Sequence, residues 1–386
     1  MVDAMADRRA TDTHPAMLVA IELSKASWLL AVHDPTTDKI SRHRIEGGDA
    51  AGLVALIGAA RRRAERRAGD PIGAECVFEA GYDGFWLHRR LSAAGIGCRV
   101  MDPASLKVDR RARRVKTDRI DAESLLRALQ AWRRGDRHAC RFVRVPDVAE
   151  EDARRPHREL DRLGKERVGH VNRIKGLLAL HGVRDYQPLR QDRRGAFEAL
   201  RAWDGAALPP HCRREIEREL ARLELVLEQI AAAQDDLATA VDAAAAAEEA
   251  VTALEALVCV GRETAAVLVR EVFCRGFGDR RSLAAFTGLA PSPYSSGRLH
   301  HEQGISKAGN PVVRARLVQL AWRWVRFQPG SAITAWFHAK AAGGGGRARR
   351  VAIVAVARKL AIALWRMATL GIVPEGARLR PAVTAG

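Results

Sequence analysis

The chain has 386 residues, which is long enough for two or three domains that each bury a core. Its formal net charge is +18, from 64 Lys and Arg residues against 46 Asp and Glu residues. This excess favours a polyanionic partner, most often nucleic acid, although a GC-rich genome also raises the arginine content. The six cysteines are far apart and form no C-x-x-C pair, which argues against a disulfide framework and against a zinc ribbon.

Neither end of the chain predicts a membrane or secretion signal. The first 15 residues lack the apolar core of a signal peptide. The most apolar later segment, Val351 to Trp365, is interrupted by Arg358 and Lys359 and is shorter than the ~18–20 apolar residues that a membrane span needs. We therefore expect a cytoplasmic protein with no membrane partner.

The N-terminal third alternates strand and helix patterns. Three short runs, LVAIEL, SWLLAVHD and KISRHRIE, follow one another from Met17 and predict adjacent antiparallel strands. We then expect a helix from about Asp49 to Arg67, a strand at Ala74–Glu79, a helix at Asp83–Ala94, a strand at Cys98–Asp102 and a further helix. This order, β-β-β-α-β-α-β-α, is that of an RNase H-like fold.

Two aspartates lie in the segment KTDRIDAESL, at the start of that last helix. Asp118 and Asp121 are spaced i, i+3, so their Cβ atoms lie roughly 5–6 Å apart and both carboxylates can reach one divalent cation. In isolation the same spacing is a helix-capping arrangement. The preceding segment favours a metal-dependent nuclease site, because its bases could hold a nucleic-acid backbone. These bases are Lys107, Arg110, Arg111, Arg113, Arg114 and Lys116.

The predicted topology would bring two further acids toward Asp118 and Asp121. Glu22 lies in the first strand, where a surface acid at a strand edge is an equally good interpretation. Glu79 ends the fourth strand after the apolar CVF, and the turn AGYDG follows it, which favours a functional role. Four carboxylates could hold two Mg²⁺ ions, which activate a nucleophile and stabilise the leaving oxygen.

The segments AIELSKASWLLAV, CVFEAGYDGFWLHRRL and DRRARRVKTDRIDAESLLRAL resemble, in order and spacing, the RuvC-like domain of the DEDD-type insertion-sequence transposases, recombinases that a bridge RNA guides. The resemblance implies a RuvC-like domain over residues 1–145, with Glu22, Glu79, Asp118 and Asp121 as a catalytic, Mg²⁺-binding tetrad. The first acid of this tetrad is usually aspartate. Glu22 is one methylene longer, which leaves the metal geometry at this position open.

Residues 146–250 predict a helical, coiled-coil region. The segment HVNRIKGLLALHGV also resembles the family, and it is equally typical of a core-facing helix with basic flanks. Pro156 is expected at the N1 position of a helix. A heptad seam follows, which could fold back on the helix at Asp161–Leu180 or pair with a second chain; we favour a role in a homo-oligomer, a dimer or a tetramer. The seam consists of Ile216, Leu220, Leu223, Leu227, Ile230, Gln234, Leu237 and Val241.

Residues 251–386 predict a mainly α-helical C-terminal domain that starts with LEALVCVGRETAAVLVREV. This segment is typical of a helix-hairpin-helix, in which backbone N–H groups at a glycine turn bind a DNA phosphate. Cys259 replaces the usual first glycine of the turn, so Gly261 is the remaining candidate for the phosphate contact. The alternative is a plain helical hairpin.

The segment AAFTGLAPSPYSSGRLHHEQGISKAGNPVVRARLVQLAW resembles the C-terminal transposase domain of the same family. The resemblance implies that Ser296, beside Ser295, is the nucleophile, whereas a Ser-Gly pair by itself is more often a turn. Nearby cations could stabilise charge on an attacked phosphodiester. These are Arg298, Lys307, Arg314 and Arg316. The stretch from Lys340 to Arg350 predicts a flexible basic loop before a last amphipathic helix.

The resemblance as a whole implies a DNA transposase that cuts and rejoins strands through the acid tetrad and Ser296. Its expected partners are double-stranded DNA at the element ends and the target, together with a structured guide RNA, in the cytoplasm at the bacterial nucleoid. One alternative is a RuvC-like junction-resolving nuclease that uses the tetrad and water. Another is a non-catalytic nucleic-acid-binding remnant of a mobile element, which Glu22, Pro156, Cys259 and the glycine run from Gly343 to Gly346 leave open.

Overall fold

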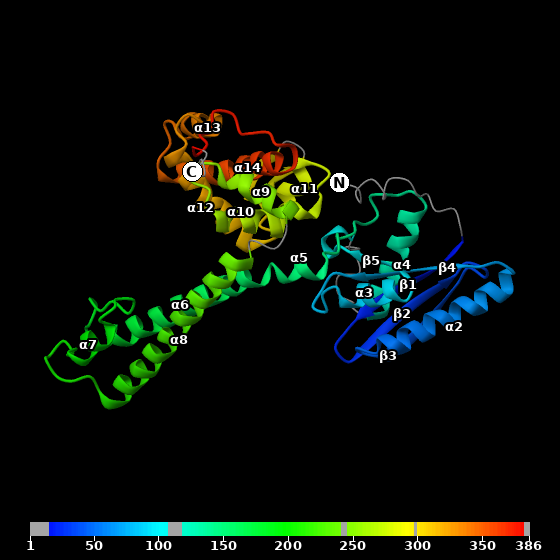
Figure 1. Cartoon of the computed structure of the whole chain (residues 1–386), viewed down its shortest axis with the longest axis horizontal. Helices are drawn as coiled ribbons and strands as arrows, with labels where there is room; N and C mark the ends of the chain where they lie inside the picture. Colours follow the sequence, from blue (N-terminus) through cyan, green and yellow to red (C-terminus); the bar gives the residue numbers. More distant parts are fainter. Residues whose placement is uncertain (1–14, 107–117, 241–244, 297–298, 382–386) are drawn as a thin grey trace. The chain divides into compact units, whose positions relative to one another are not determined.

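The computed structural model describes residues 15–106, 118–240, 245–296 and 299–381 (Figure 1). The chain forms two compact units, residues 1–147 and 148–386. Within the described ranges, no helix is both long enough and apolar enough to cross a membrane.

The first unit contains a mixed five-stranded sheet in the order β3-β2-β1-β4-β5. Its strands are β1 (Ala16–Leu23), β2 (Ser27–Asp34), β3 (Lys39–Glu46), β4 (Gly73–Glu79) and β5 (Gly97–Met101). The first three strands are antiparallel neighbours, whereas β4 runs parallel to β1 and β5 runs parallel to β4. The predicted order of strands and helices is therefore confirmed.

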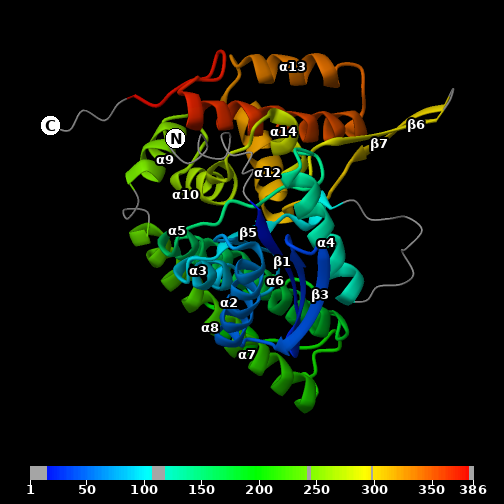
Figure 2. The same ribbon diagram turned by 90° about the vertical axis from the view of Figure 1, so that its right-hand side faces the viewer.

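Helices cover both faces of this sheet (Figure 2). They are α2 (Ala50–Ala68), α3 (Trp86–Ala93) and α4 (Asp118–Arg133), with a short 3-10 turn, η1 (Pro103–Ser105). Because successive strand residues point to opposite faces, Val19 and Ile21 of β1 pack with α2 and α3, whereas Leu18 and Ala20 pack with α4. The predicted helix from Asp83 begins later, at Trp86, because Gly81 and Gly84 form a turn with an N–H···O distance of 3.2 Å.

The second unit starts with a long helical hairpin. Its helices are α5 (Val148–Asp152), α6 (Arg155–Ala179), α7 (Arg193–Glu198) and α8 (Pro210–Ala240). Helices α6 and α8 pack against each other along their length, and α7 lies at the far end of the pair (Figure 1). Pro156 lies in the first turn of α6, as predicted.

The heptad seam of α8 is covered by α6 of the same chain. Leu220 and Leu223 are buried together with Leu178 of α6. Farther along α8, the described buried residues are Val226, Ala233 and the seam residue Leu237, and Gln234 is exposed. The prediction of Gln234 as a seam residue is wrong, because a helix of 3.6 residues per turn drifts away from a strict 3.5-residue repeat. Pairing between chains stays a prediction.

The remainder of the second unit is mainly helical. Its elements are α9 (Ala245–Glu255), α10 (Arg262–Val267), the π-helical turn η3 (Leu268–Val272), the 3-10 turn η4 (Phe273–Arg275), α11 (Arg280–Phe286), β6 (Pro291–Ser296), β7 (Leu299–Ile305), α12 (Pro311–Phe327), α13 (Ala332–Ala341) and α14 (Gly346–Leu370). Val356 and Leu360 of α14 are fully buried in the core of this region. The prediction of a basic loop is wrong for residues 347–350, because they belong to α14. Gly345 is the N-cap of this helix, and the Arg and Ala residues that follow favour a helical conformation.

Candidate functional site

Glu22 and Glu79 lie at the same edge of the sheet, where the parallel strands β1 and β4 end. Ile21 is in register with Phe78, and Glu22 and Glu79 are the next residues of the two strands. Both acids are on the face that α4 covers, because the alternating residues Ala20 and Val77 pack against α4. Both are half-buried. The sheet therefore brings these two predicted site residues to one face and one edge.

Helix α4 runs antiparallel to β1 and β4. Its last residues, Trp132 and Arg133, line a pocket together with Ala16 and Gly73, which begin the two strands. A 16-residue helix at about 1.5 Å per residue is nearly as long as an eight-residue strand at about 3.3 Å per residue. The first turn of α4 therefore lies near the edge where the strands end.

The two predicted aspartates are in that first turn. Asp118 is the first residue of α4, and its side chain is not among those that the structure describes. Asp121 is half-buried, and it precedes Ala122, which packs against the sheet. Asp121 also lies one helical turn before Leu125, which packs against the sheet, so position 121 is on or beside the sheet-facing side of α4.

The metal-binding prediction can be compared with the described side chains. Among them, no group of three or more His, Cys, Asp or Glu residues is arranged to hold a metal ion. Glu22, Glu79 and Asp121 thus do not form a complete cage by themselves, and the fourth predicted ligand, Asp118, has no described side chain. Carboxylates are nevertheless the ligands that Mg²⁺ takes in proteins. The residues fit a hard cation in chemical type, and the geometry of a metal site stays a prediction.

The basic strip that precedes α4 lies outside the described residues, so its role as a nucleic-acid contact stays a prediction. It comprises Lys107, Arg110, Arg111, Arg113, Arg114 and Lys116. A further acid of the same motif, Glu123, is described: its carboxylate lies 2.5 Å from Nη2 of Arg42 and 3.2 Å from Nη2 of Arg127. Glu123 therefore ties α4 to β3, which is a structural role.

A second charged cluster lies at the other end of α4. Glu75 accepts a hydrogen bond from Nε of Arg99 at 2.5 Å and is also paired with Arg133. The guanidinium of Arg137 lies 3.8 Å from the centre of the Trp132 ring, and that of Arg99 lies 4.5 Å from it. These residues line a pocket of about 460 Å³. The sequence analysis missed this cluster, although an acid near the start of an apolar strand could have indicated it.

The predicted nucleophile is in the β-hairpin of the second unit. Ser296 is the last residue of β6 and pairs with Leu299, and Ser295 pairs with His300. The backbone register thus puts both serines next to the hairpin turn. Their side chains lie outside the description, as does all of Arg298, so the choice between the serines stays a prediction.

The cations predicted around the serine differ in their surroundings. Lys307 is exposed and has a φ of 55°, and its carbonyl accepts a hydrogen bond from Nη1 of Arg314 at 3.0 Å. Arg316 instead donates to Asp161 at 2.9 Å and to Glu263 at 2.8 Å. Arg316 is therefore engaged in ion pairs that join α12 to α6 and α10.

The predicted helix-hairpin-helix turn lies between α9 and α10. Gly261 is the N-cap residue of α10, and Cys259 has a φ of 75°, a left-handed conformation that favours glycine. Burial raises the pKa of the Cys259 thiol to about 11. A hydrogen bond joins this turn to the segment after α14: the backbone N–H of Val258 donates to the carbonyl of Arg378 at 3.0 Å. The helical hairpin is present, and the phosphate contact of Gly261 stays a prediction.

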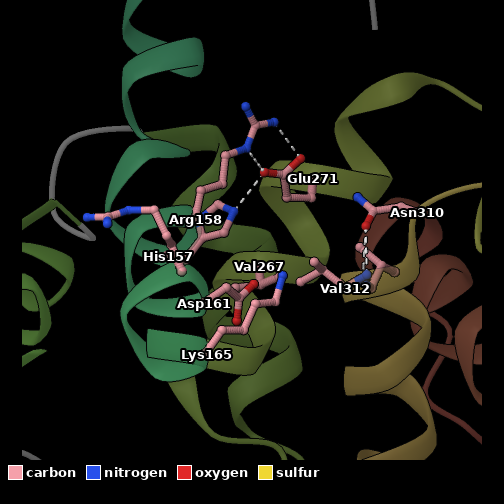
Figure 3. Close-up of a pocket in the computed structure, with 10 residues that line it drawn as sticks. His157, Arg158, Asp161, Lys165, Val267, Glu271, Asn310 and Val312 are labelled. Carbon is pink, nitrogen blue, oxygen red and sulfur yellow. Dashed lines mark hydrogen bonds and ion pairs between the residues drawn. The ribbon is translucent and has the colours of Figure 1, made fainter. Parts of the chain in front are cut away.

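An ion-pair network joins the start of α6 to η3 around a pocket of about 310 Å³ (Figure 3). Glu271 is only 4% exposed and accepts hydrogen bonds from Nε2 of His157 at 2.7 Å and from Nε of Arg158 at 2.6 Å. Burial acts to raise the pKa of Glu271, but the hydrogen bonds from His157 and Arg158 outweigh it and lower that pKa to about 2. The sequence did not predict this network, although an acid within the mostly apolar segment AAVLVREVF is a signal for a buried pair.

Comparison with known proteins gives consistent results. Residues 251–335 match the family described as "Transposase IS116/IS110/IS902 family". The chain is 46% identical over 375 residues, 95% of each chain, to the putative transposase y4rJ of Sinorhizobium fredii. It is 27% identical over 251 residues, 64% of each chain, to the transposase for insertion sequence element IS1111A of Coxiella burnetii. A match to the transposase for insertion sequence element IS1328 of Yersinia enterocolitica has 27% identity over 67% of this chain and 73% of the relative. The chain belongs to the IS116/IS110/IS902 family of insertion-sequence transposases.

Proposed function

We propose that this transposase cuts and rejoins DNA strands with an acid cluster of Glu22, Glu79, Asp118 and Asp121 and with Ser296 as the nucleophile. In this proposal the first unit is an RNase H-like, RuvC-like domain. The observation that supports the proposal is the backbone arrangement at one sheet edge: Glu22 and Glu79 are neighbours near the ends of β1 and β4, and α4 begins near that edge with Asp118.

The acid cluster is proposed to bind two Mg²⁺ ions. When bound, they would polarise the attacked phosphodiester and stabilise the leaving oxygen. The protein would supply carboxylates on two adjacent strands and on the first turn of α4, so that their separation is set by the sheet and not by a loop. The sequence resemblance and the chemistry of these ligands support this assignment.

Ser296 is proposed to exchange bonds with the DNA backbone. Its oxygen would form a bond to phosphorus as the strand bond breaks, the serine proton would pass to a base, and the leaving oxygen would become a free hydroxyl end. A phosphoserine linkage conserves the energy of the phosphodiester, so the strand could be joined to a new end without ATP. Hydrolysis by water cannot conserve it, which separates a recombinase from a junction-resolving nuclease.

Guidance by a bridge RNA is the third part of the proposal. It is supported by the resemblance in the N-terminal segments and by the net charge of +18, which suits two polyanionic partners. The RNA would read the target and element sequences through base pairing, while the protein binds backbone and shape.

The test of the serine is a covalent adduct. The protein would be incubated with Mg²⁺, DNA that carries an element end, and RNA transcribed from the DNA flanking the coding region, and the products would be separated on a denaturing gel. We expect a protein–DNA adduct that is absent in Ser296→Ala and present in Ser295→Ala. An adduct lost only in Ser295→Ala would assign the role to Ser295. Cleaved ends without any adduct would contradict the serine mechanism and favour a hydrolytic nuclease.

A further inference from the structure

Tyr82 is unusually exposed for an aromatic residue at a candidate active-site edge. Its exposed fraction is 89%, and it lies in the turn after β4, three residues beyond Glu79. An aromatic ring offers roughly 150–250 Å² of area that is ordinarily buried. Single exposed apolar side chains are common on protein surfaces, so the ring indicates a binding site only together with the groups around it.

A cation accompanies the Tyr82 ring. Nζ of Lys25 lies 5.1 Å from the ring centre, and Lys25 lies three residues beyond Glu22 in the turn after β1. That turn is ordered, because Oγ of Ser24 donates to the carbonyl of Ser27 at 2.6 Å and accepts from the Ser27 N–H at 3.2 Å. The turns that follow β1 and β4, just beyond the two predicted acids, thus present an aromatic face and an ammonium group.

A second partly exposed aromatic residue lies four positions beyond Tyr82 in the sequence. Trp86, the first residue of α3, is 40% exposed, and its ring centre lies 5.9 Å from that of the buried Trp28. Trp86 is therefore anchored in the core on one side and accessible on the other. Tyr82 lies in the turn before α3, and Trp86 begins that helix.

A flat aromatic face next to an ammonium group matches one ligand class particularly well. A nucleotide combines a planar base, which stacks on aromatic rings regardless of sequence, with a phosphate that pairs with a cation. The base must be unpaired, because neighbouring pairs cover the faces of bases inside a duplex. A nucleic-acid strand carries a negative charge at every phosphate. The net charge of +18 therefore favours such a strand over a peptide with few charges.

We infer that Tyr82 stacks on an unpaired nucleobase of the strand that reaches the acid edge, with Lys25 contacting the adjoining phosphate. This inference rests on the proposed function, because it takes that strand to be the nucleic-acid substrate. It adds a binding site for single-stranded nucleotides, which would hold an opened DNA strand in position next to Glu22 and Glu79.

The test uses the full-length protein and a single-stranded DNA oligonucleotide that contains 2-aminopurine, whose fluorescence falls when it stacks. We expect quenching with the wild type and with Tyr82→Phe. In Tyr82→Ala we expect the quenching to be lost and the affinity to fall about 10-fold, within the range that one base–aromatic stack provides. Lys25→Gln should reduce the dependence of log affinity on log salt by about 0.7, the value for one phosphate of a single strand.

Trp203→Ala is the matched control, because Trp203 is another highly exposed aromatic residue, 81% exposed, on the helical hairpin of the second unit. It should leave the quenching unchanged. Equal affinity of Tyr82→Ala and wild type, or failure of Tyr82→Phe to quench, would overturn stacking, as would absence of single-strand binding by the wild type. Tyr82-dependent binding by a protein that forms no DNA breaks with Mg²⁺ would instead contradict the proposed function and leave the stacking site intact.

Discussion

The two ends of α4 use charge in different ways. At its C-terminal end, one carboxylate, Glu75, lies between the guanidinium groups of Arg99 and Arg133. At its N-terminal end, Asp118 and Asp121 begin the helix near the edge where β1 and β4 end on further acids. Both arrangements agree with the helix dipole, which favours acids at the N-terminus and cations at the C-terminus. The first pairs one carboxylate with two guanidinium groups, whereas the second places acids from two strands and a helix near one edge of the sheet.

The largest expected effect is on catalysis at the N-terminal end. Asp121→Asn should abolish strand cleavage, because an amide keeps the shape of the side chain and loses the charge that holds Mg²⁺. DNA binding should be nearly unchanged. Cleavage with Mg²⁺ and affinity for DNA measure the two effects. If the variant cleaves normally and loses about 1 kcal/mol of unfolding free energy, Asp121 is a helix-capping residue instead.

Glu271 extends the comparison to a buried carboxylate that is balanced by His157 and Arg158. Glu271→Gln should lower the free energy of unfolding by about 2–3 kcal/mol, because it removes a buried charge that pairs with the buried His157 and the half-exposed Arg158. The folded pKa of about 2 is below the ordinary value of 4.5. Ionised Glu271 therefore stabilises the fold above pH ~4.5, and this contribution is lost as the pH falls from ~4.5 through ~2.

This contribution is measured from the free energies of unfolding of the wild type and of Glu271→Gln, which circular dichroism gives at several pH values between 7 and 2.5. The difference between the two proteins should shrink as the pH falls. Glu166→Gln is the control, since Glu166 pairs with Arg162 on the exposed side of α6 and an exposed pair contributes about 1 kcal/mol or less. A pH-independent difference would mean that Glu271 acts through packing and not through its charge.

Glu75→Gln should have the opposite pattern to Asp121→Asn. We expect the free energy of unfolding to fall by about 1–3 kcal/mol, because Arg99 and Arg133 lose the charge between them, while cleavage per folded molecule is retained. Glu123→Gln is a control on α4, because Glu123 also pairs with an arginine but has a more exposed partner, Arg42, and a smaller expected loss. Urea unfolding and cleavage measure the two properties. Loss of cleavage in a stably folded Glu75→Gln would contradict the division of roles between the two ends of α4.

The sequence was sufficient for the features that depend on local pattern. Alternating apolar residues predicted the strands, and their order predicted that Glu22 and Glu79 share an edge, as the parallel register of β1 and β4 confirms. The sequence was insufficient for features that depend on distant partners. Glu271 lies 114 positions from His157, and Glu75 lies 58 positions from Arg133, so no local pattern indicated which acids are balanced by cations.

The heptad seam shows a different limit. Its pattern is the same whether the partner helix belongs to the same chain or to another, so the sequence left both arrangements open. The fold places Leu178 of α6 against Leu220 and Leu223 of α8. The error at Gln234 arose because a seven-residue repeat read from sequence ignores the drift of a real helix, which rotates Ala233 into the interface instead.

The smallest expected effect comes from Glu22→Asp. The resemblance implies that aspartate is usual at this position. Glu22 is also only half-buried beside Glu79, so a shorter acid leaves no enclosed cavity there. If Glu22 is a metal ligand, Glu22→Asp should cleave DNA at close to the wild-type rate, and Glu22→Gln, which has the wild-type length and no charge, should be inactive. Initial cleavage rates over a range of Mg²⁺ concentrations measure both variants. Normal cleavage by both variants would show that Glu22 is a surface acid at a strand edge. Loss of cleavage by both would show that the charge alone is not sufficient and that the cluster is built around the longer side chain.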